Sequence, residues 1–264
     1  MKTCFLFAIV FGIAFAACAQ DWAKAKIEKS TRHGEWVKLK HDNREVSSFI
    51  TYPEVKEKAT AVVVIHEIFG LSDWAREMTD ELAAEGYIAI APDLLSGMAP
   101  KGGGTDELGQ TGATRAIGSL PANQILADLD AAVDYVSKLP SCNGKVVVMG
   151  FCWGGGQTFN FAIHNHNLKA GLSFYGNIPT DPSALAKITC PIYGFYGEND
   201  NRITASVPKG TEQMKAAGRT YEPITYTGAG HGFMRGGEDP AGREADKKAR
   251  DDAWIRVREI LKKI

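Results

Sequence analysis

The stretch that decides the fold reads KVVVMGFCWGG and runs from Lys145 to Gly155. Its first half is a continuous apolar run rich in valine, which is typical of a strand buried on both faces of a parallel sheet. Its second half has the spacing Gly-x-Cys-x-Gly, the pattern of a sharp strand-to-helix turn that presents a nucleophile, with Cys152 where serine is usual. Gly150 and Gly154 flank this turn, where side chains would keep strand and helix apart. We therefore predict that Cys152 is a nucleophile whose thiolate is favoured by the helix N-terminus, against the alternative of an inert buried cysteine.

The segments on either side of this stretch alternate between strand-like and helix-like patterns. This alternation predicts an α/β fold with a mostly parallel central sheet and helices on both faces. Residues 36–40 and 46–52 alternate apolar and polar side chains, which predicts an N-terminal antiparallel hairpin. The chain shows no repeat and no long linker, so residues 20–264 are expected to form one domain. The other predicted strands are 61–65, 87–91, 145–149, 170–175, 192–196 and 221–226, and the predicted helices are 73–85, 122–139, 155–164, 207–217 and 244–264.

The segment 94–120 interrupts this alternation. It contains Gly102 to Gly104 and shows neither a helical nor a strand period. We expect an irregular connection here, and two interpretations stay open: a flap over a functional site, or a solvated surface excursion.

Two polar residues that follow later strands are candidates to assist Cys152. Asp200 and His231 each come after a predicted strand, and the carboxyl ends of parallel strands meet at one edge of the sheet. The chain order nucleophile, acid, histidine is that of α/β-hydrolases, in which the histidine is the base and the acid orients it. Glu198 is the rival acid, and we prefer Asp200 because it lies further into the loop beyond the strand.

A third strand end carries His66-Glu67-Ile68-Phe69-Gly70, where this fold supplies its second oxyanion donor. Glycine at position 70 rules out the His-Glu-x-x-His zinc motif. The other histidines do not indicate a metal either, because His33 and His41 are expected at the surface and His164 and His166 at a solvated helix end. The sequence therefore predicts chemistry without a metal or a cofactor.

Together these motifs resemble the dienelactone hydrolase (carboxymethylenebutenolidase) family of the α/β-hydrolase superfamily. The resemblance implies that Glu67 holds or accepts the proton of the Cys152 thiol until substrate displaces it. It also implies that the N–H groups of Ile68 and Trp153 form the oxyanion hole and that Arg235 binds a substrate carboxylate. The resemblance runs from about residue 37 to the C-terminus and rests on His66-Glu67-Ile68-Phe69-Gly70, Ala91-Pro92-Asp93-Leu94, Gly150-Phe151-Cys152-Trp153-Gly154-Gly155, Asp200, and Gly230-His231-Gly232-Phe233 with Arg235.

The sequence departs from the family pattern at two positions. Gly97 stands where the family's enzyme for chloroaromatic breakdown has a second carboxylate-binding arginine, and Gly232 replaces a serine that follows the histidine. These departures, together with a predicted leader for export, argue against dienelactone itself as the natural substrate.

Composition and the N-terminal segment limit the classes of function. The 264 residues include 30 basic and 31 acidic side chains, a net charge of −1, which offers no field to attract nucleic acid or an anionic membrane. Residues 4–17 form an apolar run too short to span a bilayer, which predicts a signal peptide over 1–19 and an exported, periplasmic or secreted protein. A lipoprotein signal over 1–17, with a lipid on Cys18, is the alternative.

Export would leave three cysteines, an odd number of thiols. Cys142 and Cys190 both precede predicted strands, so they are expected at the edge of the sheet opposite Cys152. A disulfide between them stays an open alternative, and it would leave Cys152 as the free thiol.

The sequence thus predicts a monomeric, exported hydrolase that cleaves small esters or lactones through a thioester on Cys152. His231, oriented by Asp200, would move the protons, and the amides of Ile68 and Trp153 would stabilise the oxyanion. A non-catalytic binding protein with the same fold is the alternative. Thiol redox chemistry is disfavoured because the chain has no Cys-x-x-Cys motif.

Overall fold

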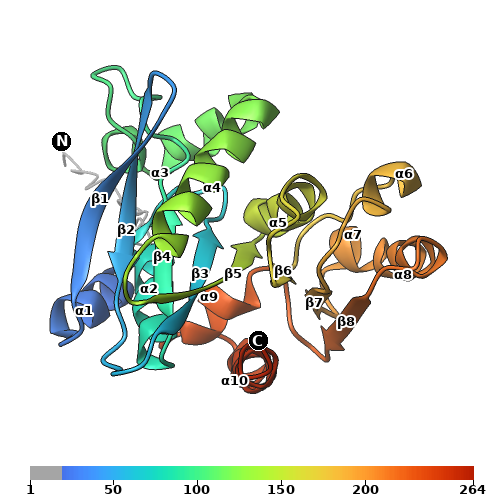
Figure 1. Ribbon diagram of the computed structural model, residues 1–264. Helices are drawn as coiled ribbons and strands as arrows, with labels where there is room; N and C mark the ends of the chain where they lie inside the picture. The colour runs from blue at the N-terminus through green and yellow to red at the C-terminus, as the bar shows by residue number, and fades with distance from the viewer. Residues whose placement is uncertain (1–19) are drawn as a thin grey trace, which may run out of the picture.

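The computed structural model describes residues 20–264, and the predicted signal segment 1–19 lies outside the described residues. Eight strands form one sheet in the order β1-β2-β4-β3-β5-β6-β7-β8 (Figure 1). β2 is antiparallel to β1 and β4, and every later pair is parallel. This arrangement confirms the predicted α/β-hydrolase fold with an N-terminal hairpin. The strands are β1 (Gly34–His41), β2 (Arg44–Thr51), β3 (Ala59–Ile65), β4 (Ile88–Pro92), β5 (Cys142–Phe151), β6 (Ala170–Phe174), β7 (Ile192–Gly197) and β8 (Tyr221–Tyr226).

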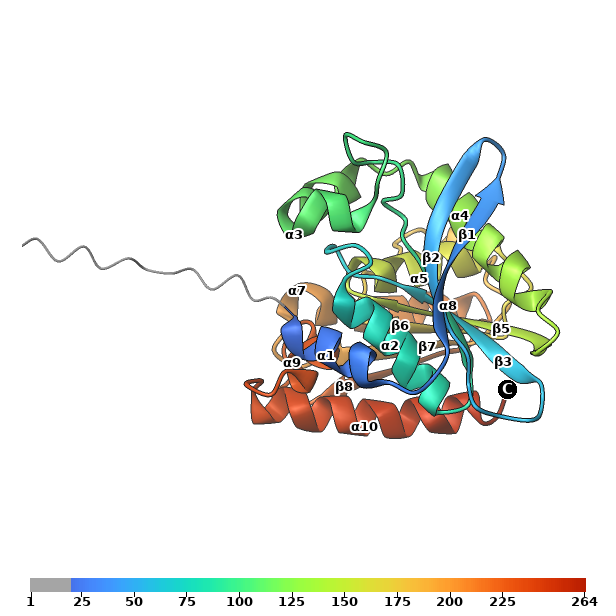
Figure 2. The ribbon, with the colours of Figure 1, turned by 90° about the vertical axis from the view of Figure 1, so that its left-hand side faces the viewer.

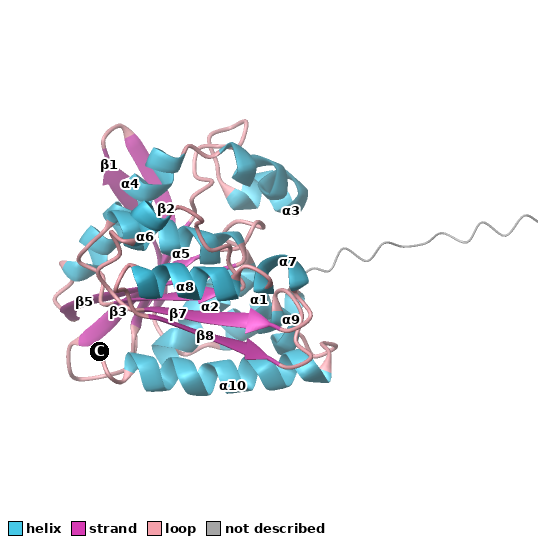
Figure 3. Ribbon diagram, turned by 90° about the vertical axis from the view of Figure 1, so that its right-hand side faces the viewer, coloured by secondary structure: helices cyan, strands magenta, loops and turns pink. Residues whose placement is uncertain are grey.

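Helices cover both faces of the sheet and enclose two apolar cores (Figure 1, Figure 2). Figure 3 shows α8 and α10 on opposite sides of β7 and β8. In β3, Val63 packs into one core and Val64 into the other, because successive side chains of a strand point to opposite faces. A continuous apolar run is therefore what such a strand requires. The helices are α1 (Asp21–Lys29), α2 (Asp73–Ala84), α3 (Thr105–Ala116), the short 3₁₀ helix η1 (Ile117–Ser119), α4 (Ala122–Ser137), α5 (Trp153–His164), α6 (Pro182–Leu185), α7 (Asn201–Thr204), α8 (Val207–Ala216), α9 (Phe233–Glu238) and α10 (Glu244–Leu261).

The segment 94–120 is not the irregular connection that the sequence predicted, because it contains α3 and η1. Its period was hidden by a kink at Gly109, whose φ of 61° and ψ of 173° are open to glycine but not to other residues. Tertiary contacts start the helix: the backbone N–H and the hydroxyl of Thr105 both donate to the carboxylate of Asp93, each at 2.7 Å. α3 lies on the side of the sheet at which the parallel strands end (Figure 3).

The N-terminal region differs from expectation at two places. Helix α1 was not predicted, because Ala23 is its one buried residue and its amphipathic pattern is weak. His41 is not a free surface residue: its Nε2 lies 2.6 Å from Asp128 Oδ1, and its side chain is 18% exposed. Asp128 is fully buried and also accepts from Arg44, so His41 belongs to a buried ionic cluster.

Cys142 and Cys190 are free thiols, so the disulfide that the sequence left open is not formed. Cys142 begins β5 and Cys190 lies just before β7, with β6 between the two strands. Neighbouring strands are about 4.8 Å apart, which separates β5 from β7 by about 10 Å, and a disulfide bridges Cα atoms no more than about 7 Å apart. Among residues 20–264, no helix has the length and apolarity needed to cross a bilayer.

Candidate active site

Cys152 occupies a strained turn between β5 and α5. Its φ of 57° and ψ of −116° lie in a region that residues other than glycine rarely adopt. The turn depends on its glycines: a Cβ on Gly150 would lie 2.0 Å from the carbonyl oxygen of Gly154, and a Cβ on Gly154 would lie 2.3 Å from that of Ile65. The N–H of Cys152 donates to the carbonyl of Phe174 in β6 at 3.0 Å. The sheet therefore holds the turn in place and positions the thiol beyond its edge.

The structure brings Cys152, His231 and Asp200 into contact. Nε2 of His231 lies 3.1 Å from Sγ of Cys152, and Nδ1 lies 2.6 Å from Oδ2 of Asp200. An ionised carboxylate only accepts hydrogen bonds, so Nδ1 carries the imidazole proton and the lone pair of Nε2 faces the thiol. Asp200 is buried, whereas the rival Glu198 is exposed and accepts from the backbone N–H of Gly228. Asp200 is therefore the acid placed to orient His231.

The surroundings of Cys152 favour the neutral thiol. Burial, followed by repulsion from the carboxylate of Glu67, raises the pKa of Cys152 to about 11. The backbone N–H groups of Trp153 and Ile68 and the positive charge of Arg202 lower this pKa but do not compensate. The amide at the helix N-terminus does favour the thiolate, as expected, but burial and the charge of Glu67 outweigh it. The two amides lie next to the sulfur, as an oxyanion hole requires.

Glu67 is buried and paired with Arg235. Its Oε2 accepts from Nε of Arg235 at 2.8 Å, and its Oε1 accepts from the hydroxyl of Tyr175 at 3.5 Å. The resemblance implied that Glu67 holds the proton of Cys152, but in this structure the thiol contacts His231 instead. Arg235 is bound to Glu67 through Nε, and its side chain remains 33% exposed.

Sequence reasoning missed Tyr175, which it placed only at the end of a strand. Tyr175 is fully buried with a φ of 40°, and its ring centroid lies 5.1 Å from that of His231. Burial and the charge of Glu67 raise the pKa of Tyr175 well above its usual value, so the hydroxyl stays a hydrogen-bond donor to Glu67. The available signal was its position directly after β6, the strand beside β5.

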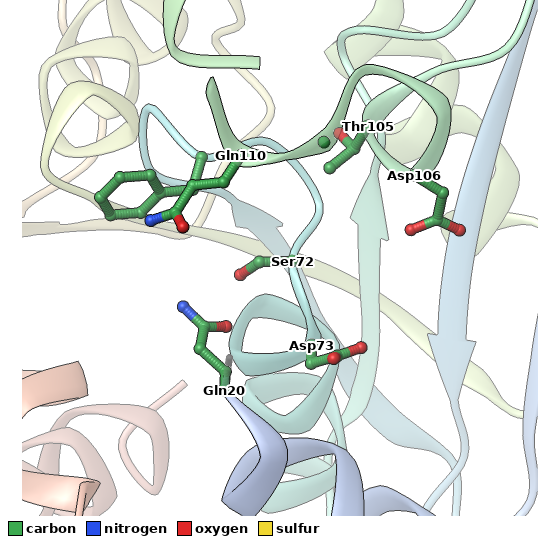
Figure 4. Close-up of a pocket in the computed structure, with 8 residues that line it drawn as sticks. Gln20, Ser72, Asp73, Thr105, Asp106 and Gln110 are labelled. Atoms are coloured by element: carbon green, nitrogen blue, oxygen red, sulfur yellow. The ribbon is translucent and has the colours of Figure 1, made fainter. Parts of the chain in front are cut away.

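A pocket of about 230 Å³ lies between α3, the loop after β3 and the start of α2 (Figure 4). Phe69 forms part of its wall and also contacts Arg235, whose guanidinium carbon lies 5.1 Å from the ring centroid. The pocket therefore adjoins the residues around Glu67, and α3 forms one of its sides. It contains two carboxylates and no basic side chain, and the lining residues are Gln20, Phe69, Ser72, Asp73, Thr105, Asp106, Gly109 and Gln110.

One cluster of carboxylates within residues 20–264 has the spacing of a metal site. An oxygen from each of Glu77, Glu81 and Glu238 lies within 4.8 Å of the other two. Lys26 contacts all three carboxylates, and Arg250 contacts Glu81 and Glu238. These two cations already balance most of the negative charge, so we assign no metal there.

Comparison with known proteins identifies the family. The model of the "Dienelactone hydrolase family" matches residues 46–264. This chain belongs to the dienelactone hydrolase family. It is therefore a hydrolase of the dienelactone hydrolase class, and the match includes every candidate residue from Glu67 to Arg235.

Relatives of this dienelactone hydrolase family member cover most of its length. It is 34% identical over 213 residues to a protein of Escherichia coli (strain K12) named "Putative carboxymethylenebutenolidase". This match covers 76% of each of the two chains. A protein of the same name from Saccharolobus solfataricus is 30% identical over 255 residues, or 84% of this chain and 96% of the relative. The crystal structure named "Putative Dienelactone Hydrolase" from Klebsiella pneumoniae has a TM-score of 0.77 and 24% identity, and the match covers 89% of this chain and all of that one. This last likeness supports the fold.

Proposed function

We propose that this protein hydrolyses small esters or lactones with Cys152 as the nucleophile. The observation that carries the proposal is the unbroken chain of contacts from Cys152 through His231 to Asp200, at 3.1 and 2.6 Å. Family membership supports the reaction class, and the two amides beside the sulfur supply the donors that an acyl-transfer transition state needs.

The first half of the reaction forms a thioester. Because the Cys152 thiol is protonated at neutral pH, Nε2 of His231 takes its proton as the sulfur attacks the ester carbonyl carbon. The carbonyl oxygen becomes an oxyanion and accepts hydrogen bonds from the N–H groups of Ile68 and Trp153. The C–O bond to the alcohol then breaks, and His231 returns its proton to the departing alkoxide.

The second half releases the acid. A water molecule gives a proton to Nε2 of His231 and attacks the thioester carbonyl, and the same amides hold the second oxyanion. The C–S bond breaks, and the sulfur recovers the proton from His231. Asp200 remains ionised and keeps the imidazole oriented throughout. A thiolate is a good leaving group, so the first tetrahedral intermediate expels the sulfur again unless the alcohol also leaves readily. This suits the site to activated esters and enol lactones rather than to amides.

Arg235 is proposed to select substrates that carry a carboxylate. A substrate carboxylate that reaches Arg235 competes with Glu67 for the guanidinium, and this competition couples recognition to a change around the thiol. The arginine beside Gly97 does not assist. Arg44 lies beside Gly97, but its guanidinium is held by Asp128 and by backbone carbonyls. Because no arginine at position 97 supports Arg235, we expect partial rather than absolute selectivity.

The test uses p-nitrophenyl acetate with the wild type, Cys152→Ala and the matched control Cys190→Ala. We expect turnover to vanish in Cys152→Ala and to persist in Cys190→Ala, because Cys190 is a buried thiol before β7. Acid-quenched samples should show an acetylated protein by intact mass in the wild type but not in Cys152→Ala. Turnover that survives in Cys152→Ala would refute the proposal.

A further inference from the structure

His66 is a buried histidine next to the proposed active site, and both of its ring nitrogens are in use. It directly follows β3 and is 0% exposed. Its Nε2 accepts from the backbone N–H of Leu94 at 3.3 Å, so the ring proton resides on Nδ1. Nδ1 then donates to the carbonyl oxygen of Glu67 at 2.8 Å. The surroundings thus fix one neutral tautomer, and burial acts in the same direction by lowering the pKa of His66.

The carbonyl that His66 holds belongs to the same peptide unit as the N–H of Ile68. A trans peptide is planar, with its C=O and N–H pointing in opposite directions. Holding the oxygen of Glu67 on one side therefore aims the N–H of Ile68 at the other side, where it approaches the sulfur of Cys152. If this peptide rotated, a carbonyl oxygen would face the developing oxyanion and the attraction would become repulsion.

The same ring also packs against the side chain of Trp153, the residue whose N–H is the second oxyanion donor. The His66 and Trp153 rings are stacked with centroids 5.8 Å apart and an angle of 16° between their planes. The backbone of His66 abuts the nucleophile turn as well, because a Cβ on Gly154 would lie 2.5 Å from the carbonyl oxygen of His66. One buried side chain therefore contacts both segments that carry the oxyanion donors.

His66 also connects these donors to the segment that contains α3. Leu94, its partner at Nε2, opens the segment 94–120. Further along this segment, Thr105 accepts the N–H of Leu71 at 2.9 Å and fills the space beside Gly70. The loop after β3 is thus held to the segment at two points, one of which is the ring of His66.

We propose that His66 is a positioning residue of the oxyanion hole: its Nδ1–H holds the Glu67–Ile68 peptide so that the N–H of Ile68 faces the reacting carbonyl. This inference rests on the proposed function, because it assumes acyl transfer at Cys152. The role belongs to the hydrogen bond to Glu67, whereas the stacking on Trp153 by itself does not orient the peptide.

Two variants separate these contributions. His66→Asn retains an N–H donor close to the position of Nδ1 and loses the ring, whereas His66→Phe retains the ring and its stacking on Trp153 and loses both nitrogens. The assay is steady-state hydrolysis of p-nitrophenyl acetate. We expect kcat of His66→Phe to fall by about 10²-fold, as for loss of one oxyanion donor, with KM within about twofold. We expect kcat of His66→Asn to be at least about tenfold higher than that of His66→Phe.

Thermal unfolding and iodoacetamide labelling of Cys152 show whether each variant is folded and keeps an accessible thiol. If His66→Phe is not folded, His66→Leu takes its place. The inference is overturned if the apolar variant turns over as fast as His66→Asn, or if its loss lies in KM rather than kcat. Wild-type turnover that does not depend on Cys152 would instead refute the proposed function, so the two failures are distinguishable.

Discussion

Replacing Glu67 by glutamine should make the resting Cys152 thiol more reactive. After burial, the carboxylate of Glu67 is the largest cause that raises the pKa of Cys152, to about 11. At pH 8 a thiol with this pKa is ionised in about one molecule in a thousand. A nearby charge shifts a pKa by about one to three units, so we take one unit for the loss of Glu67, equal to about 1.4 kcal/mol. The thiolate population then rises about tenfold.

The expected gain in alkylation rate is smaller than the gain in thiolate. The nucleophilicity of a thiolate falls as its pKa falls, with a Brønsted coefficient of about 0.4 to 0.5. A pKa lower by one unit therefore makes each thiolate about threefold less reactive, and the alkylation rate rises by only about three- to fourfold. The assay is the pseudo-first-order rate of iodoacetamide labelling of Cys152 at pH 8, followed by peptide mass mapping. The matched control is Tyr175→Phe, which removes a hydroxyl contact to Glu67 but leaves its charge, and its rate should stay within about twofold of wild type. Slower labelling in Glu67→Gln would refute this reasoning and identify Glu67 as the proton acceptor of the resting thiol.

Three further changes test other parts of the structure. Asp200→Asn should lower kcat about 10⁴-fold because an amide favours the wrong imidazole tautomer, whereas Glu198→Gln should change kcat less than about twofold. A larger loss of kcat in Glu198→Gln than in Asp200→Asn would contradict the assignment of the acid. Glu77→Gln should flatten the pH dependence of stability, because burial and neighbouring carboxylates raise the pKa of Glu77 to about 10. Above pH ~5 the native wild type therefore binds one proton more than the unfolded chain. Its free energy of unfolding, measured with urea, should fall by up to about 1.4 kcal/mol per pH unit until about pH 10. Arg235→Met should lower kcat/KM for an anionic ester about ten- to a hundredfold relative to a neutral ester of matched size, and an unchanged ratio would assign Arg235 to structure alone.

The sheet and the nucleophile turn were predictable because their signals are local. A strand buried on both faces needs an unbroken apolar run, as in β3, where Val63 and Val64 enter different cores. The turn at Cys152 needs small residues on both sides, as the contacts of a Cβ at Gly150 or Gly154 show. Asp200 and His231 were placed beside Cys152 because parallel strands bring their carboxyl ends to one edge.

The structure of α3 was not predictable from its own residues. A glycine-only conformation at Gly109 breaks the helical period, and the first turn depends on the Asp93 carboxylate, which bonds Thr105 from 12 positions earlier in the chain. Such contacts exist only after β4 and the segment that follows it have packed.

The sequence by itself determined the order of the eight strands and of helices α2, α4, α5, α8 and α10, the position of the nucleophile turn and the family, because these depend on periodicity and on short-range spacing. Only the tertiary structure decided the protonation of Cys152 and the pairing of Glu67 with Arg235. A pKa depends on desolvation and on charges that neighbours in space supply, and Glu67 and Arg235 are separated by 168 positions along the chain. Burial of the thiol and the proximity of these charges arise only when the loop after β3, the turn after β5 and α9 come together.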